Sequence, residues 1–215
     1  QKFLNADSAR EIVFTRNATH SLNQVAHGMT WSKGDVVLTT DREHNSNLVP
    51  WLQLEQARGI DHRVVQSNSD NTFDIEAFEV ACADAGSQLK MVSMSQVGNL
   101  DGIKIPLKKI AKIAHDHGAL VCVDGAQSTP HMNVDVQDLD IDFLAFSIHK
   151  MCGPSGMGGL WGRYELLDDL RTIQSGGQTV KSSTYDSIEW ANPPARFEGG
   201  LGNFSGMIAT GAAID

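Results

Sequence analysis

Residues 120–127 read LVCVDGAQ, and residues 143–150 read FLAFSIHK. Each segment opens with four apolar residues and continues directly into polar ones. Short apolar runs of this kind are typical of strands that lie inside a sheet covered on both faces. The two segments therefore predict buried strands at Leu120–Val123 and Phe143–Phe146, with Asp124 and Lys150 just beyond their carboxyl ends.

The same pattern extends outward along the chain. Further strands are predicted at Val36–Thr40, Arg63–Val65 and Lys90–Ser95. Helical patterns lie between the strands: apolar residues recur at intervals of three and four from Leu22 to Met29, and much the same from Leu107 to His117. Alternating strands and helices predict an α/β fold, with a mostly parallel sheet flanked by helices.

The remaining segments favour a single domain. The glycine-rich stretch at residues 152–162, CGPSGMGGLWG, is interpreted as a loop leading into another strand. Met207–Ala213 is interpreted as a helix. No repeat or linker divides the chain, so residues 1–215 are expected to form one domain. Because the chain begins without methionine and stops within the last predicted helix, we expect it to be a fragment.

Composition excludes several classes of protein. The formal charge of −9 at pH 7 argues against nucleic acid, which needs a clustered basic face. The longest apolar runs are too short to cross a bilayer, so no membrane partner is expected. Cys82, Cys122 and Cys152 have neither the density of a disulfide framework nor the spacing of metal ligands. We expect no metal site and a reducing, cytoplasmic setting.

Polar residues follow four of the predicted strands, and ligands of open α/β sheets bind outside the carboxyl ends of strands. The residues concerned are His44, Asn99, Asp124, Gln127, Ser147, His149 and Lys150. A lysine and a carboxylate facing one cleft are what pyridoxal 5′-phosphate (PLP) requires of a protein. Asp124 suits the protonated pyridine nitrogen, because an ion pair in a partly buried site favours the charged ring.

The phosphate of such a cofactor would be held by Thr19, Ser147 and His149. Thr19 precedes the predicted helix at Ser21–Met29, whose free N–H groups suit an anion. Each residue alone also has a plainer interpretation: Lys150 as a solvated charge, Asp124 as part of a turn, and Thr19 as a helix cap. Their joint placement at neighbouring strand ends favours the cofactor site.

An ordered series of motifs runs from about residue 11 to the end. It comprises IVFTR at 12–16, EHNSNLVPW at 43–51, VDGAQ at 123–127, PH at 130–131, VDV at 134–136, SIHK at 147–150, GPSG at 153–156 and RFE at 196–198. With these motifs the chain resembles the group II cysteine desulfurase and selenocysteine lyase branch of the class V aminotransferases, PLP-dependent transferases of fold type I. The resemblance implies the large domain of that fold.

The resemblance also implies a role for each site residue. Lys150 would form the Schiff base and move the substrate's α-proton, and His44 would stack on the ring and assist proton transfer. Asp124 would pair with the pyridine nitrogen, while Gln127 and Asn99 would hydrogen-bond the phenolic oxygen. The substrate would be L-cysteine or L-selenocysteine. A homodimer and a sulfur-acceptor protein are the implied partners.

Several positions depart from the family's pattern. The phosphate loop Gly-Thr-Thr is Asn17-Ala18-Thr19 here, so a hydroxyl and a glycine are missing. Leu201 stands where the partner subunit usually offers a threonine, which puts a phosphate contact across the dimer in doubt. Cys152 replaces a common tyrosine, and we expect it to be a packing residue rather than a nucleophile.

The family's N-terminal segment and C-terminal small domain are expected to be absent, and with them the sulfur-accepting cysteine and the substrate arginine. Three alternatives therefore stay open. The chain could serve another class V reaction, such as that of an aminotransferase, an epimerase or a kynureninase. It could be a PLP-binding module without turnover. It could also be a plain α/β scaffold, because fold alone does not decide function.

Overall fold

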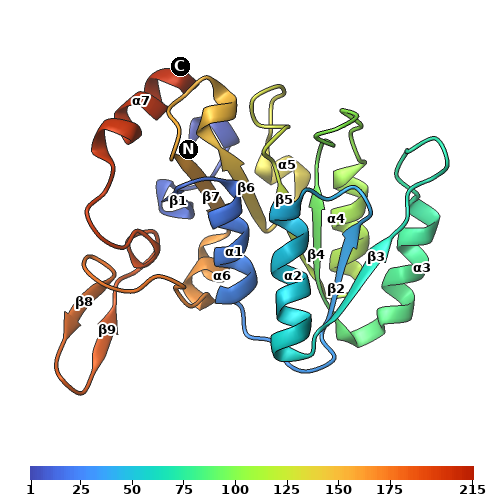
Figure 1. The fold of residues 1–215 in the computed structure, drawn as a ribbon, viewed down its shortest axis with the longest axis horizontal. Coiled ribbons are helices and arrows are strands. Elements are labelled where there is room, and N and C mark those ends of the chain that lie inside the picture. The colour runs from blue at the N-terminus through green and yellow to red at the C-terminus, as the bar shows by residue number, and fades with distance from the viewer.

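The computed structural model describes residues 1–215, and a seven-stranded sheet forms its centre (Figure 1). The strand order is β1-β7-β6-β5-β4-β2-β3. The strands are β1 (Ile12–Thr15), β2 (Val36–Thr40), β3 (Asp61–Val65), β4 (Leu89–Ser95), β5 (Leu120–Asp124), β6 (Phe143–Ser147) and β7 (Gly158–Gly162). Strands β2 to β6 are parallel, whereas β7 is antiparallel to both β1 and β6. The predicted fold class is confirmed.

All five predicted strands are present, with ends that differ from the predicted ones by at most two residues. The prediction for residues 152–162 was only partly right, because Gly158–Gly162 is not loop but the strand β7. Glycine normally weakens a strand. Here aromatic rings occupy the space of the missing side chains: a Cβ at Gly159 would collide with the ring of Phe146, and one at Gly162 with that of Phe143.

Helices cover both faces of the sheet. On one face lie α3 (Ile75–Ala85), α4 (Leu107–Asp116) and α5 (Val136–Leu139), and on the other lie α1 (Ala18–Gly28), α2 (Asn45–Arg58) and α6 (Tyr164–Asp169). Alternate residues of a strand point to opposite faces. In β2, Val36 and Leu38 accordingly belong to the first core and Val37 to the second.

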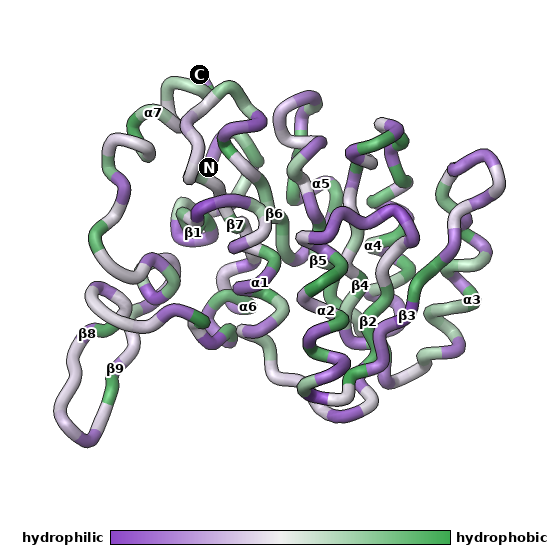
Figure 2. The backbone as a smooth tube through the Cα atoms, viewed as in Figure 1, coloured by the Kyte–Doolittle hydropathy of each residue, from purple (hydrophilic) through white to green (hydrophobic).

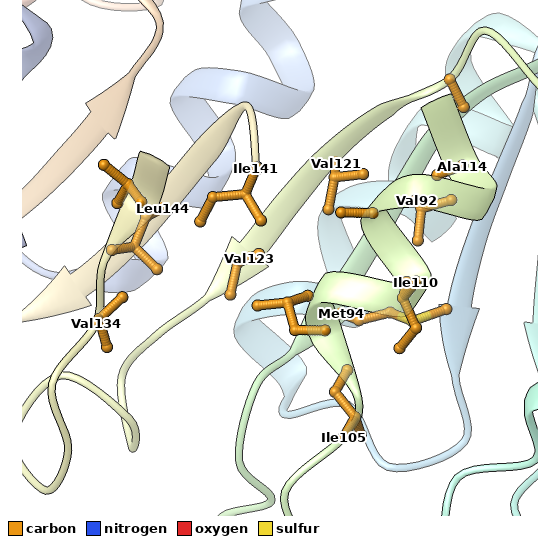
Figure 3. Close-up of a cluster of buried hydrophobic side chains, with 14 of the residues drawn as sticks. Val92, Met94, Ile105, Ile110, Ala114, Val121, Val123, Val134, Ile141 and Leu144 are labelled. Carbon is orange, nitrogen blue, oxygen red and sulfur yellow. The ribbon is translucent and has the colours of Figure 1, made fainter. Parts of the chain in front are cut away.

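Figure 3 shows the core beneath α4. Ile110 and Ala114 of the helix pack against a layer of branched side chains from β4 and β5, including Val92 and Val121, and all four are buried. The periodic apolar residues of the Leu107–His117 segment therefore face the sheet, as their spacing predicts. This packing fixes β4 and β5 side by side, and hence the positions of the polar residues that follow them.

The C-terminal part of the chain lies at one end of the sheet. A two-stranded hairpin, β8 (Val180–Ser183) and β9 (Ile188–Trp190), projects from the body of the molecule (Figure 1). The last helix, α7 (Phe204–Ile214), contains the predicted Met207–Ala213 segment. No helix of the structure has both the length and the apolar character that crossing a membrane would require.

Candidate active site

A cavity of about 250 Å³ opens at the carboxyl ends of the parallel strands, the place where open α/β sheets bind ligands. Its walls come from the N-terminus of α1 and from the segments that follow β2, β4, β5 and β6. The segment between β2 and α2 is hydrophilic throughout most of its length (Figure 2). The cavity is lined by all eight residues predicted from the sequence: Thr19, His44, Asn99, Asp124, Gln127, Ser147, His149 and Lys150.

Asp124 and Lys150 share this cavity although they follow different strands. Asp124 ends β5 and is 5% exposed, and its Oδ1 accepts a hydrogen bond of 2.9 Å from the Ala126 N–H. Burial raises the pKa of the Asp124 carboxyl, while the Ala126 N–H and the positive charges of Lys150 and His44 oppose that rise. Lys150 is exposed in the short 3-10 turn that follows β6. The cavity therefore pairs a buried acid with an accessible amine.

Helix α1 starts earlier than predicted, at Ala18, and Asn17 is its N-cap residue. Its side-chain Oδ1 accepts a hydrogen bond of 2.9 Å from the His20 N–H and caps the helix. Thr19 was predicted to precede the helix and instead lies in its first turn. An asparagine cap satisfies a backbone N–H that a glycine at this position would leave free. Asn17 lines the cavity, and while its Oδ1 caps the helix, its Nδ2 remains available as a donor.

Further donors surround Asn17. The Ser147 Oγ accepts a buried hydrogen bond of 2.8 Å from the Ala18 N–H, so its own hydroxyl proton remains available for donation. The Thr19 N–H has no acceptor within the protein. Gly158 allows this arrangement, because a Cβ there would lie 2.5 Å from the Asn17 Cα. This end of the cavity thus offers several donors to an anion.

His44 is the N-cap residue of α2. Its Nδ1 accepts a hydrogen bond of 3.1 Å from the Ser46 N–H, and the Ser46 hydroxyl lies 2.9 Å from the same nitrogen. The Ser46 Oγ is also 2.7 Å from the Thr19 Oγ1. Sequence reasoning did not single out Ser46, because its partner Thr19 is 27 residues away and no periodicity connects the two.

Glu43 is a second residue that sequence reasoning missed. Its carboxylate accepts hydrogen bonds from the Thr40 hydroxyl (2.6 Å), the Asn47 amide (2.7 Å) and both the N–H and the hydroxyl of Ser95. Burial raises the pKa of the Glu43 carboxyl, and these donors oppose the rise. Glu43 thereby ties the ends of β2 and β4 to the start of α2, directly beside His44.

Replacing Glu43 with alanine is expected to lower the free energy of unfolding by about 3 kcal/mol, because it leaves several buried donors without an acceptor. Urea unfolding followed by circular dichroism would measure the change. The exposed Glu165 offers a control, and its replacement with alanine should cost less than about 0.5 kcal/mol. Equal urea midpoints of unfolding for Glu43→Ala and the unsubstituted protein would contradict the proposal that Glu43 stabilises the contact between β2, β4 and α2.

The structure corrects the expectation for Cys152. This residue was expected to be a packing residue rather than a nucleophile, but its side chain is exposed; it also lies outside the cavity lining. It ends the 3-10 turn after β6 with a φ of 60°, and this left-handed conformation directs the chain back toward β7. Leu201 is likewise exposed, at 83%, and borders a different hollow beside Phe14 and Glu198.

The chain was compared with known proteins. The family model for aminotransferase class-V matches residues 1–215. A probable cysteine desulfurase of Halalkalibacterium halodurans is 41% identical, over 100% of this chain and 53% of its own length. The crystal structure of the cysteine desulfurase CsdA from Escherichia coli superposes with a TM-score of 0.94 at 34% identity, over 99% of this chain and 53% of that one.

A more distant solved structure is that of a C-DES variant with glycine covalently linked to its PLP cofactor. It has a TM-score of 0.88 and 26% identity, over 99% of this chain and 56% of that one. The chain thus spans about half the length of the curated relatives that it matches. The family match, in contrast, extends from the first residue to the last. The chain belongs to the class-V aminotransferase family.

Proposed function

We propose that the chain is the PLP-binding domain of an enzyme that removes sulfur from L-cysteine, or selenium from L-selenocysteine, and leaves alanine. The observation that carries this proposal is the single cavity lined by both the amine of Lys150 and the buried carboxyl of Asp124. Relatives named cysteine desulfurase support the choice of reaction.

The ring end of the cavity fits PLP. Burial raises the pKa of the Asp124 carboxyl because it disfavours the negative charge. A cationic N–H placed in the cavity would stabilise that charge. Asp124 would therefore hold a protonated pyridine nitrogen. Gln127 and Asn99 line the same cavity and can donate to the phenolic oxygen, and His44 borders it from α2.

The phosphate end fits as well. The donors available are the hydroxyl proton of Ser147, the Thr19 N–H and the Asn17 Nδ2, and His149 lies at the rim. The family's Gly-Thr-Thr loop is Asn17-Ala18-Thr19 in this chain. The donors of Asn17 and of the helix N-terminus would replace those of the missing glycine and threonine. Backbone N–H groups at a helix N-terminus attract phosphate through both hydrogen bonding and the helix dipole.

When bound, PLP supplies an aldehyde carbon for amines and a cationic ring that stabilises the electron pair left at the substrate's Cα. The chain's own residues do the rest. Lys150 would hold the cofactor, and its amine would then serve as the acid–base group that moves the substrate's α-proton. Asp124 would keep the ring nitrogen charged, and His44 would contact the ring.

The sulfur moves to a thiolate: an S–S bond forms, the C–S bond breaks, and the Cβ takes a proton to give alanine. None of the three cysteines of this chain suits that role. Burial raises the pKa of both Cys82 and Cys122 to about 12, so both thiols are protonated near neutral pH. Cys152 is exposed but lies outside the cavity. The accepting thiol is therefore proposed to come from elsewhere.

The oligomeric state, cellular compartment and partner protein are proposed from the same similarity to cysteine desulfurases. The chain would act as a homodimer in the cytoplasm, with a sulfur-acceptor protein as partner. The second candidate function is another class-V reaction, namely that of an aminotransferase, epimerase or kynureninase-like enzyme. It is kept because Lys150, Asp124 and the phosphate donors serve all of these reactions equally.

The products formed from L-cysteine decide between these functions. We expect alanine in amounts equal to the sulfur transferred, measured by amino-acid analysis with dithiothreitol as thiol acceptor. The assay is made with the 215-residue chain and with the complete gene product. Pyruvate and ammonia, a racemised substrate or a keto acid formed from another amino acid would each contradict the desulfurase. Turnover by the complete product alone would show that the rest of the protein supplies a group that the reaction needs, the acceptor thiol or the substrate arginine.

A further inference from the structure

A continuous chain of hydrogen bonds runs along the lining of the cavity. It runs from the Thr19 hydroxyl, at the donor-rich end, to the Ser46 hydroxyl at 2.7 Å and on to the His44 Nδ1 at 2.9 Å. All three residues line the cavity. Nothing in the family match assigns a role to Ser46.

The direction of these bonds follows from one backbone group. The Ser46 N–H lies 3.1 Å from the His44 Nδ1 and can only donate, so Nδ1 must be the acceptor. The neutral imidazole then carries its proton on Nε2. Since Nδ1 has no proton to give, the Ser46 hydroxyl must donate to it. The Ser46 oxygen is left as an acceptor, and Thr19 is its donor.

A phosphate group at Thr19 changes this arrangement, because its oxygens are strong acceptors. The Thr19 hydroxyl would then donate its hydrogen bond to the phosphate and no longer to Ser46. The Thr19 oxygen then needs a donor, and the Ser46 hydroxyl can supply it by rotating away from His44. The Ser46 N–H remains to hold Nδ1. All donors and acceptors stay satisfied, and consecutive hydrogen bonds of one direction strengthen one another.

We propose that Ser46 is a positioning residue whose hydroxyl turns from His44 to Thr19 when a phosphate-bearing ligand enters the cavity, so that phosphate binding is transmitted to the imidazole. This proposal rests on the proposed PLP site. In the empty protein the Ser46 N–H and the Ser46 hydroxyl share the one lone pair of Nδ1, whereas in the loaded protein only the N–H uses it. The ring that faces the cofactor is then held by the backbone alone.

The first test observes His44 directly, in cofactor-free protein labelled with ¹⁵N. The His44 signals are identified by comparison with His44→Gln, and inorganic phosphate is added as the ligand. We expect the Nε2–H tautomer throughout, with the Nδ1 resonance moving on phosphate addition toward that of a nitrogen with fewer hydrogen bonds. In Ser46→Ala, the Nδ1 resonance should already have the shifted value without phosphate and should not move when phosphate is added. Ser46→Thr should restore the response.

The second test compares PLP with pyridoxal, which lacks the phosphate. Ser46→Ala should weaken PLP binding about fivefold, the usual net value of one hydrogen bond, and leave pyridoxal binding unchanged. Thr19→Val should weaken PLP binding at least as much. In the double variant the Ser46 substitution should add no further loss, because Ser46 acts through Thr19.

Three results would overturn the proposal: an Nδ1–H tautomer in the unsubstituted protein, a phosphate response that survives in Ser46→Ala, or equal losses of PLP and pyridoxal binding. No His44 response at phosphate concentrations that block PLP binding would also overturn it. Failure of the proposed function looks different, since neither aldehyde would then become attached to Lys150 on borohydride reduction.

Discussion

Lys150→Ala is expected to abolish covalent capture of PLP. Borohydride reduction of the loaded protein should fix a pyridoxyl group on the peptide that contains Lys150, and the variant should show none. The amine is the only lysine nitrogen among the residues that line the cavity. Exchange of the substrate's Cα hydrogen with solvent should fall by at least about a hundredfold, because the positioned acid–base group is lost.

Lys112, an exposed lysine paired with Asp116 on α4, provides the matched control. Its replacement with alanine should leave both the adduct and the exchange rate unchanged. The readouts are peptide mass mapping after reduction and proton NMR in deuterated water. An adduct on a different lysine in the unsubstituted protein would remove the basis of the proposed function.

Asp124→Asn is expected to weaken PLP binding and to stabilise the empty protein. The asparagine oxygen can still accept the Ala126 N–H, so the local turn is retained. The variant loses the charge that balances the pyridinium, however. Breaking a buried ion pair costs about 3 kcal/mol, which corresponds to more than a hundredfold in affinity.

The stability effect of Asp124→Asn follows from the raised pKa of the Asp124 carboxyl. A carboxyl that binds its proton more tightly in the folded state favours folding while protonated, and this contribution is lost as the pH rises through the raised pKa. In the cofactor-free protein the ionised carboxylate is therefore a cost near neutral pH. Asparagine removes that cost, so the melting temperature should rise by a few degrees.

Thermal unfolding at a series of pH values measures this second effect. The difference between Asp124→Asn and the unsubstituted protein should shrink toward acidic pH, where Asp124 is protonated in both folded and unfolded chains. Saturating PLP should reverse the order of stabilities, because it binds the unsubstituted protein more tightly. A variant that is less stable at neutral pH and binds PLP normally would disprove the pairing of Asp124 with the ring nitrogen.

The sequence predicted β2, β5 and β6 well because each carries a continuous apolar run that the two helix layers cover. It predicted β7 poorly, since a glycine-rich strand lacks that signal and is stabilised instead by aromatic rings from the neighbouring strand β6. Helix α2 also escaped prediction. Most of its apolar residues fall in one run, LVPWL at 48–52, without helical spacing and with Pro50 inside it, and its start depends on the His44 side chain, which is an uncommon cap.

The predicted site residues all reached one cavity, because the carboxyl ends of parallel strands meet at a single edge. The residues that sequence reasoning missed, Asn17, Glu43 and Ser46, act through hydrogen bonds between separate elements. Glu43 and Ser95 are 52 residues apart, for example. Contacts of that kind leave no spacing pattern, and only three-dimensional packing reveals them.

The order of strands in the sheet also has a consequence for biosynthesis. Strand β1, near the start of the chain, pairs with β7 and not with its neighbours in sequence, and the Ala18 N–H meets the hydroxyl of Ser147, 129 residues later. Strand β1 therefore has no strand to pair with until the ribosome has produced residues up to about 162. A nascent chain released before that point would contain the parallel strands β2 to β6 but would leave β1 without a strand neighbour, so the segment that leads from β1 into the phosphate end of the cavity would be held less firmly.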